Sequence, residues 1–201
     1  MRNRVTPVGD IVAIALRGAW LGNRGILHEG TEIRRFHASN LWITCLLRFR
    51  GRHMRQWQPH HYTHLYFFDE AVAFSAGHRP CAECRRADYN AFRSAWAHGL
   101  GVDLPTAKQM DQQLHAERLY RGTHRRRLHE LPWRSVPTGA FVLLEVGPAL
   151  VRRDAILPWS TTGYAAPQSR PRHGDAQVIT PPAILAAFEA GYPVQISGQE
   201  P

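Results

Sequence analysis

One stretch of 20 residues carries most of the information about how this chain folds. Residues 67–86 read FFDEAVAFSAGHRPCAECRR. A short β-prone run ends at Phe68, and the next residue, Asp69, is of a type that caps helix N-termini. We expect a short helix to follow and to stop at Gly77, because glycine readily adopts the left-handed conformation found at helix ends. The stretch therefore predicts a strand, a short helix and a tight turn in close succession.

Two cysteines in the second half of this stretch, Cys81 and Cys84, have the spacing of a metal-binding turn. Two thiolates separated by two residues can hold one metal ion, and the N-terminus of a following helix favours their deprotonated form. A redox-active dithiol is the alternative, but no thioredoxin-like βαβ pattern surrounds the pair. The sequence therefore favours a metal site at these two residues.

Residues 67–86, and more loosely residues 40–86, resemble the Ada-type zinc-binding domain of the DNA alkylation-repair family. In that family a strand and a short helix containing Glu-Ala lead to Gly-aromatic-Arg-Pro-Cys-x-x-Cys, and the run from Glu70 to Cys84 is similar. The family binds one zinc ion through four cysteines, contacts DNA, and uses one zinc thiolate to take a methyl group from a DNA phosphate. The resemblance implies zinc as cofactor, DNA as partner and a role in DNA repair.

The chain departs from that family pattern because it contains only three cysteines. The family's first cysteine pair should lie upstream, and Cys45 is the only cysteine available there. Three cysteines and one histidine complete a zinc site most economically, with either His28 or His53 as the histidine. The choice between these histidines stays open at this point, and the missing cysteine argues against a simple transfer of the methyl-acceptor chemistry.

The charge of the chain is positive and concentrated in its first half. Lys and Arg number 25 against 16 Asp and Glu, giving a net charge of +9. Residues 1–100 hold 14 arginines and 7 acidic residues, whereas residues 101–201 are closer to neutral. Arginines interleaved with aromatic residues suit contact with phosphates and stacking on bases. We expect the following residues to contact DNA: Asn23, Arg24, Arg50, Arg52, Arg79, Arg85 and Arg86.

A second pattern, His115-Ala-Glu117, resembles part of another zinc site. Zinc nucleobase deaminases combine His-x-Glu with Pro-Cys-x-x-Cys, where the glutamate moves protons to and from a zinc-bound water. The two parts occur here in the reverse order, and His115 falls inside an expected helix. His115 and Glu117 are candidate catalytic residues, either for a deaminase-like site or for another hydrolysis on DNA, and the alternative is that they are exposed helix residues.

The pattern along the whole chain predicts an α+β fold. We expect a strand-rich N-terminal part with the zinc site, central helices over residues 85–98 and 105–121, a β-meander over 139–159 and a short final helix. The turn from Gly22 to Gly25 predicts a local hairpin. We divide the chain into an Ada-like basic region, residues 1–104, and a helix and β-meander region, residues 105–201, and expect the two to form one compact unit.

Composition excludes several classes of protein. Three cysteines cannot form a disulfide framework, and the apolar run Ile11–Leu16 is too short to cross a membrane. We expect a cytoplasmic, zinc-containing DNA-binding protein that acts in DNA repair or on modified bases, with base excision or another base hydrolysis as its reaction. The alternatives are a non-catalytic zinc-stapled DNA-binding or regulatory module and a zinc-dependent, deaminase-like nucleobase hydrolase.

Overall fold

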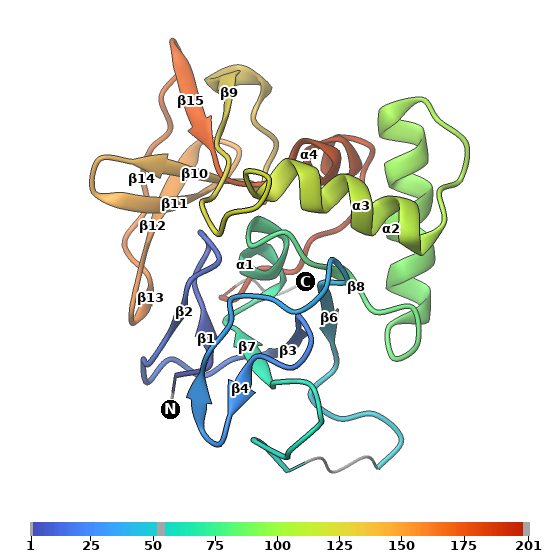
Figure 1. Ribbon diagram of the computed structural model, residues 1–201. Helices are drawn as coiled ribbons and strands as arrows, with labels where there is room; N and C mark the ends of the chain where they lie inside the picture. The colour runs from blue at the N-terminus through green and yellow to red at the C-terminus, as the bar shows by residue number, and fades with distance from the viewer. Residues whose placement is uncertain (1, 52–54, 199–201) are drawn as a thin grey trace.

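A six-stranded sheet organises the N-terminal half of the chain in the computed structural model, which describes residues 2–51 and 55–198. Its strand order is β2-β1-β7-β3-β6-β8 (Figure 1). The strands are β1 (Arg4–Val5), β2 (Ile11–Val12), β3 (Trp20–Asn23), β6 (Ile43–Cys45), β7 (Leu65–Phe67) and β8 (Arg79–Pro80). A separate hairpin is formed by β4 (His28–Glu29) and β5 (Glu32–Ile33).

Strand β3 lies inside this sheet and not in the local hairpin that its following turn predicts. Leu21 pairs with Cys45 on β6 and with Tyr66 on β7. The neighbouring Gly22 permits this close pairing, since a Cβ there would lie 2.8 Å from Cζ of the Phe67 ring and closer still to Cε2. The hairpin prediction is wrong because β6 and β7, both distant in sequence, occupy the two edges of β3.

The short helix α1 (Glu70–Ser75) begins and ends where the sequence predicts. The Asp69 carboxylate accepts a hydrogen bond from the Val72 N–H at 2.9 Å, which is the interaction of an N-cap. The chain leaves the helix through Gly77, whose φ is +85°, and a Cβ there would lie 2.7 Å from Cδ of Arg118. Glycine is required at this position on both counts. Strand β8 and the cysteine turn follow directly.

Three longer helices pack together through an aromatic core. They are α2 (Arg86–Leu100), α3 (Ala107–Arg118) and α4 (Pro182–Glu189). Phe74 of α1 lies 5.2 Å from Phe92 of α2 and 5.4 Å from Phe188 of α4, measured between ring centroids. This cluster therefore joins helices from the two regions that the sequence separates at residue 104.

A second, antiparallel sheet forms the C-terminal part, in the order β13-β12-β11-β10-β15-β9 with β14 beside β12. Its strands are β9 (His129–Pro132), β10 (Phe141–Leu144), β11 (Gly147–Val151), β12 (Ala155–Ser160), β13 (Gly163–Tyr164), β14 (Gln168–Ser169) and β15 (Asp175–Val178). A 3-10 turn (Trp133–Ser135) follows β9. The expected meander is β10, β11 and β12. Strand β9 is not predicted, because its residues become a strand only by pairing with β15.

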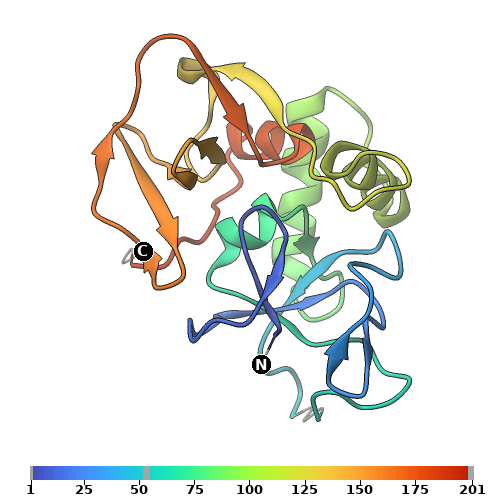
Figure 2. The ribbon, with the colours of Figure 1, turned by 60° about the vertical axis from the view of Figure 1, so that its left-hand side comes forward.

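Helix α1 lies between the two sheets, as Figures 1 and 2 both show. One apolar cluster contains Val5 and Phe67 from the first sheet, Val72 from α1, and Phe141 and Leu150 from the second sheet. The architecture is the α+β fold that the sequence predicts. None of the helices in the described part of the chain has the length and apolar character that crossing a bilayer requires.

Candidate metal centre

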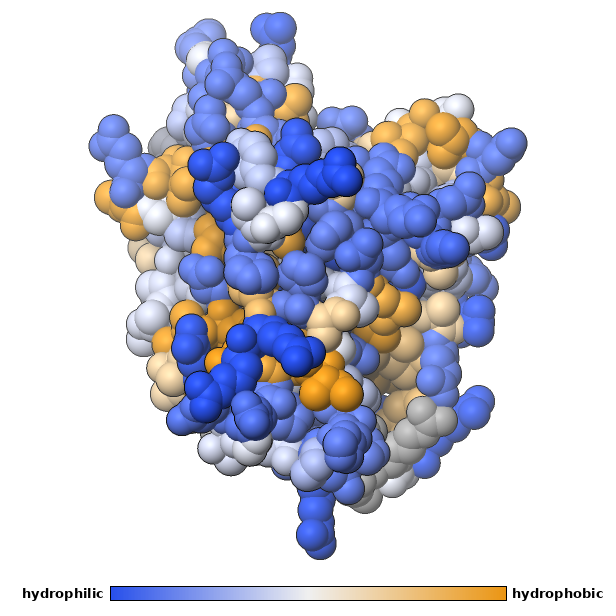
Figure 3. All heavy atoms as spheres, viewed as in Figure 1, coloured by the Kyte–Doolittle hydropathy of each residue, from blue (hydrophilic) through white to orange (hydrophobic). Residues whose placement is uncertain are grey.

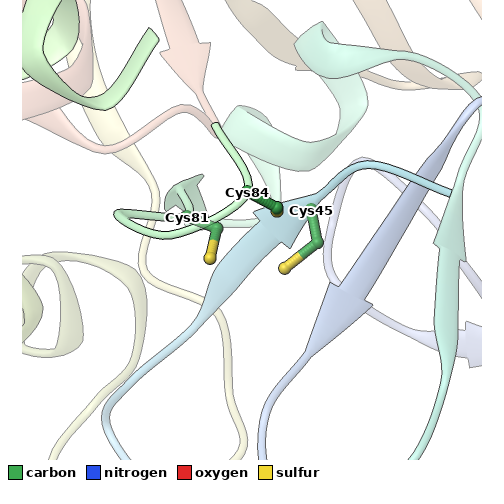
Figure 4. A group of neighbouring side chains, drawn as sticks. All are labelled: Cys45, Cys81 and Cys84. Atoms are coloured by element: carbon green, nitrogen blue, oxygen red, sulfur yellow. The ribbon is translucent and has the colours of Figure 1, made fainter. Parts of the chain in front are cut away.

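Three cysteines from two distant parts of the chain meet beside the N-terminal sheet. Cys45 ends β6, Cys81 follows β8, and Cys84 precedes α2. Their Sγ atoms all lie within 4.8 Å of one another, and Figure 4 shows how the side chains converge. This group contains the three cysteines that the sequence predicts as metal ligands.

The pairing of β6 with β8 creates this meeting point. The two strands are parallel, with Thr44 opposite Pro80, so the next residues along the chain, Cys45 and Cys81, lie side by side. The Cys81 N–H donates to the Thr44 carbonyl at 3.0 Å and extends the ladder by one residue. The cysteine that stands alone in the sequence is therefore brought to the pair by sheet register.

The turn between Cys81 and Cys84 has the hydrogen bonding of a thiolate-binding loop. The Glu83 N–H donates to Cys81 Sγ at 3.4 Å, and the Arg85 N–H donates to the Cys81 carbonyl at 3.1 Å. Helix α2 begins at Arg86, so its positive N-terminal end lies next to the sulfur atoms. Both features favour the deprotonated form of a cysteine.

The three thiols also hydrogen bond to one another. Hydrogen bonds from Cys45 and Cys84 lower the pKa of Cys81, and the same contact with Cys81 raises the pKa of Cys45. These shifts favour a thiolate at Cys81 over one at Cys45 when no metal is bound. A divalent cation in their midst would replace the protons on the other two sulfurs, so metal binding would release protons.

The arrangement fits a zinc ion. Two sulfurs bound to a tetrahedral zinc at ~2.3 Å from the ion are about 3.8 Å apart, which agrees with the observed grouping. Thiolate is a soft ligand that selects zinc over magnesium or calcium. The donor set contributed by the described residues is three sulfurs, which leaves one position of a tetrahedron to another group.

A cavity of about 370 Å³ opens beside the sulfur atoms. Its walls are aromatic and aliphatic, with a few polar groups among them, and the lining residues are Leu21, Asn23, Ile43, Cys45, Leu46, Leu47, Arg48, Phe49, Tyr62, His64, Tyr66, Cys81, Glu83 and Cys84. The Tyr62 and His64 rings lie 5.1 Å apart. Burial raises the pKa of Tyr62 and lowers that of His64, so both side chains are neutral at pH 7.

The expected histidine ligands do not join the group in the described part of the chain. The Nδ1 atom of His28 lies 2.6 Å from the Thr63 hydroxyl, and its ring packs against Trp57. His53 lies outside the described residues. His64 is the histidine that lines the cavity, and sequence reasoning missed it. No local signal marks it, because it reaches the cavity through the pairing of β7 with β3, the strand that carries Asn23.

His115 and Glu117 lie on α3, apart from the cysteine group and its cavity. The Glu117 carboxylate accepts the Ala183 N–H at 3.0 Å in the first turn of α4 and the Gln113 side-chain amide at 2.9 Å. His115 Nδ1 lies 3.2 Å from an Arg118 nitrogen. The structure therefore does not assemble the deaminase-like combination of His-x-Glu with the cysteine pair.

Three arginines that the sequence assigns to DNA contact are buried. Arg24, Arg79 and Arg85 are at most 3% exposed. The Arg79 guanidinium makes two 2.8 Å hydrogen bonds to the Asp111 carboxylate, and Arg85 pairs with Glu70. The prediction that these three form a DNA-contacting surface is corrected, because their guanidinium groups are used inside the fold.

Arg24 is held by aromatic rings and not by a carboxylate in the described residues. Its Cζ lies 4.7 Å from the Phe36 centroid and 4.0 Å from the Trp42 centroid, and one nitrogen donates to the Gly9 carbonyl. Arg118 also stacks on Trp42, at 3.8 Å. Such cation–π contacts compensate part of the cost of burying a guanidinium.

The remaining predicted contact residues are placed closer to the cavity or on the surface. Asn23 lines the cavity, and its side-chain oxygen accepts the Gly25 N–H at 2.7 Å. Arg50 and Arg86 are exposed, whereas Arg52 lies outside the described residues. Arg48, which the sequence did not single out as a contact, is exposed and lines the cavity.

No family model matches the chain, and no match is found among curated proteins or solved structures.

Proposed function

We propose that this chain is a zinc-containing DNA-binding protein that processes modified or damaged bases at its cysteine centre. The observation that carries the proposal is the position of three thiols in the wall of a cavity of about 370 Å³. Binding sites for small molecules are concave, mostly apolar and supplied with a few convergent polar groups. The cavity has each of these properties, and its three thiols add a metal-binding wall.

The number of protein ligands favours chemistry over a purely structural role. Structural zinc sites have four protein ligands, whereas catalytic sites have three and leave a fourth position to water or substrate. Among the residues that the structure describes, Cys45, Cys81 and Cys84 supply three. When bound, zinc supplies Lewis-acid polarisation and a water of lowered pKa.

The cavity walls suit a planar ring taken out of a base stack. Phe49, Tyr62 and Tyr66 are aromatic lining residues, and aromatic side chains stack on any base. Asn23 contributes a side-chain amide to the lining, and His64 a neutral imidazole. Amides and neutral imidazoles can both donate and accept hydrogen bonds, as recognition of a base edge requires.

One exposed arginine in the cavity lining and two close to lining residues in sequence suit the backbone of the same strand. Arg48 lines the cavity and is exposed, and Arg50 is exposed two residues later. Arg86 is exposed two residues after Cys84. Exposed guanidinium groups bind phosphates, and proteins that act on a base must hold the backbone on either side of it.

Metal content and coordination form the first test. We expect purified protein to contain one zinc per chain, and X-ray absorption at the zinc edge to show three sulfur ligands and one nitrogen or oxygen. Exchange with bulk water or an added anion at the fourth position would support a catalytic centre. A fourth protein ligand that no added anion displaces would favour the non-catalytic, zinc-stapled module.

Oligonucleotides with a panel of modified and damaged bases form the second test, read for abasic sites, altered bases and strand breaks. We expect affinity to fall with salt, and the Arg48→Gln/Arg50→Gln variant to bind more weakly with a salt slope smaller by about 2. Arg17→Gln/Arg121→Gln, with the same loss of charge on exposed residues elsewhere, is the matched control. Salt-independent binding would refute DNA as the partner, and tight binding without a product across the panel would favour the module.

A further inference from the structure

A second cavity, of about 420 Å³, lies at the edge of the C-terminal sheet. Figures 1 and 2 place its elements, β14 and the turn between β11 and β12, on the side of the molecule away from β6 and β8. Its lining is dominated by arginine: the residues are Arg134, Arg153, Asp154, Ser169, Arg170, Pro171 and Arg172. Four guanidinium groups face one carboxylate there, so the cavity has a formal charge of +3 in a region of the chain that is otherwise close to neutral.

Arg170 connects the backbone segments that form this cavity. Its guanidinium donates to the carbonyls of Arg152, Trp133 and Val136, so it joins the end of β11 to the 3-10 turn that follows β9. The backbone segments that carry the other arginines are thereby fixed relative to one another. The concave wall is part of the fold and does not depend on the conformation of mobile side chains alone.

The three outer arginines keep unused hydrogen-bond donors for a ligand. Arg134 and Arg172 are exposed and make no hydrogen bond or ion pair within the described residues. Arg153 has one loose contact, 3.9 Å to Asp154, with both side chains more than 80% exposed. An ion pair at that distance and exposure contributes little. The three guanidinium groups therefore keep most of their hydrogen-bond donors for another partner.

We propose that this cavity is a phosphate-binding site. Guanidinium groups match the oxygens of a phosphate through paired hydrogen bonds, and several arginines around one concavity favour a dianion over a carboxylate. The Ser169 hydroxyl adds a donor of the kind that completes such sites. The phosphate belongs either to a small phosphorylated molecule or to a nucleic-acid backbone, and the chemistry of recognition is the same for both.

Calorimetric titration with pyrophosphate, in a buffer free of other phosphate, tests this site. We expect saturable binding at one site per chain. Arg134→Gln/Arg172→Gln should weaken the affinity by about tenfold or more, since each substitution removes charge-assisted hydrogen bonds. Arg17→Gln/Arg121→Gln removes the same charge from exposed positions elsewhere and should leave the affinity within about twofold. An unchanged melting temperature would show that the cavity variant is folded.

The source of the phosphate is decided by competition with a single-stranded oligonucleotide. If the oligonucleotide displaces pyrophosphate and the cavity variant reduces the salt slope of its binding, the backbone is the source. If pyrophosphate binds without competition, the source is a small phosphorylated ligand. The proposal is overturned if pyrophosphate shows no saturable binding in the millimolar range or binds both double variants equally. Cys45→Ser should bind pyrophosphate normally, so this test of the phosphate site is independent of the proposal for the cysteine centre.

Discussion

At the scale of single residues, arginine has two uses in this protein that look the same in the sequence. Arg85 is buried against Glu70, and its Cζ lies 4.0 Å from the centroid of the Trp20 ring, whereas its neighbour Arg86 is exposed. Both follow the cysteine pair directly. The buried arginine fixes the turn that carries Cys81 and Cys84, and the exposed one lies on the surface.

Glu70 connects this arginine to the end of the chain. Its carboxylate accepts hydrogen bonds from Arg85, from the Tyr192 hydroxyl at 3.0 Å and from the Gln195 N–H at 2.9 Å. Burial raises the pKa of Glu70, and the positive charge of Arg85 opposes that shift. The two buried charges thus stabilise each other, and Arg85 has a second, partly exposed partner in Asp88 at 2.8 Å.

We predict that Glu70→Gln lowers the free energy of unfolding by about 1.5–3 kcal/mol, because it removes the buried charge partner of Arg85 and leaves only the partly exposed Asp88. Urea denaturation at pH 7 measures the loss. The matched control is Glu32→Gln, which removes one of two exposed acidic partners of Arg34 and should cost less than about 0.5 kcal/mol. A cost for Glu70→Gln as small as that of the control would show that Arg85 is not confined to the interior.

His37 gives the protein a defined response to acid. Burial, followed by the neighbouring His115, His124, Arg118 and Arg24, lowers the pKa of His37 from 6.5 to about 4. Between these values the unfolded chain binds a proton at this residue and the folded chain does not. Stability contributed by neutral His37 is therefore fully present above pH 6.5 and is lost as the pH falls towards 4.

We predict that His37→Gln makes the free energy of unfolding fall less steeply between pH 6.5 and 4. The change is a fraction of the ~1.4 kcal/mol per pH unit that one full proton would give, since the ring is partly exposed. Chemical denaturation at several pH values provides the slope. His98→Gln, at an exposed position on α2, should leave the slope unchanged, and an equal effect of both substitutions would contradict the assignment to His37.

At the scale of elements, the sequence predicts best where the signals are local. The Asp69 cap, the stop at Gly77 and the cysteine spacing are contained within 20 residues, and the structure confirms this strand, helix and turn. Strand β3 shows the limit, since its turn predicts a hairpin and its actual partners lie 20 or more residues away. Short strands are decided by pairing and not by their own residues.

The residues of the candidate site likewise divide into those that local sequence signals reveal and those that strand pairing brings together. Cys81 and Cys84 are recognisable from spacing, and Cys45 by elimination. Tyr62, His64 and Arg48 could not be identified in this way, because they reach the cavity through the register of β6 and β7. Their side chains carry no local mark that distinguishes them from the other aromatic and basic residues of the same region.

Close pairing of β3 and β7 supports a prediction about Gly22. We expect Gly22→Ala to destabilise the protein by about 1–3 kcal/mol, because the new methyl group overlaps the Phe67 ring. Combining it with Phe67→Leu should cost less than the sum of the two single substitutions, since the smaller side chain relieves the overlap. Denaturation of the three variants yields the coupling energy. Simple additivity would show that the strand adjusts without contact between these residues.

At the scale of the whole molecule, the charge is divided among the interior and several surface regions. Figure 3 shows hydrophilic side chains gathered over the connector between α3 and β9 and around the β4–β5 hairpin. These segments contain the exposed Arg34, Arg35, Arg121, Arg125 and Arg127. The net charge of +9 therefore overestimates the charge of any one binding surface. The salt dependence of DNA binding will reflect only the arginines of the face that contacts the DNA.

The cysteine centre joins β6 to the start of α2, and through Arg85 and Glu70 it is linked to α1, the helix between the two sheets. A ligand that binds only the folded state stabilises it by an amount set by its concentration, about 2.7 kcal/mol at one hundred times Kd. Because the core around α1 is shared, we predict that this stabilisation appears in the single unfolding transition of the whole chain.

Zinc added to metal-free protein at that excess should raise the melting temperature by roughly 5–10 °C, measured by calorimetry under reducing conditions. Magnesium at the same concentration should have no such effect, because three thiolates are poor ligands for a hard ion. Cys45→Ser should lose most of the zinc-dependent shift while still unfolding cooperatively, since the hydroxyl is a much weaker ligand at the end of an unchanged strand. If zinc raises the melting temperature of wild type and Cys45→Ser equally, Cys45 does not bind the metal, and the three-sulfur centre is reduced to the Cys81–Cys84 pair.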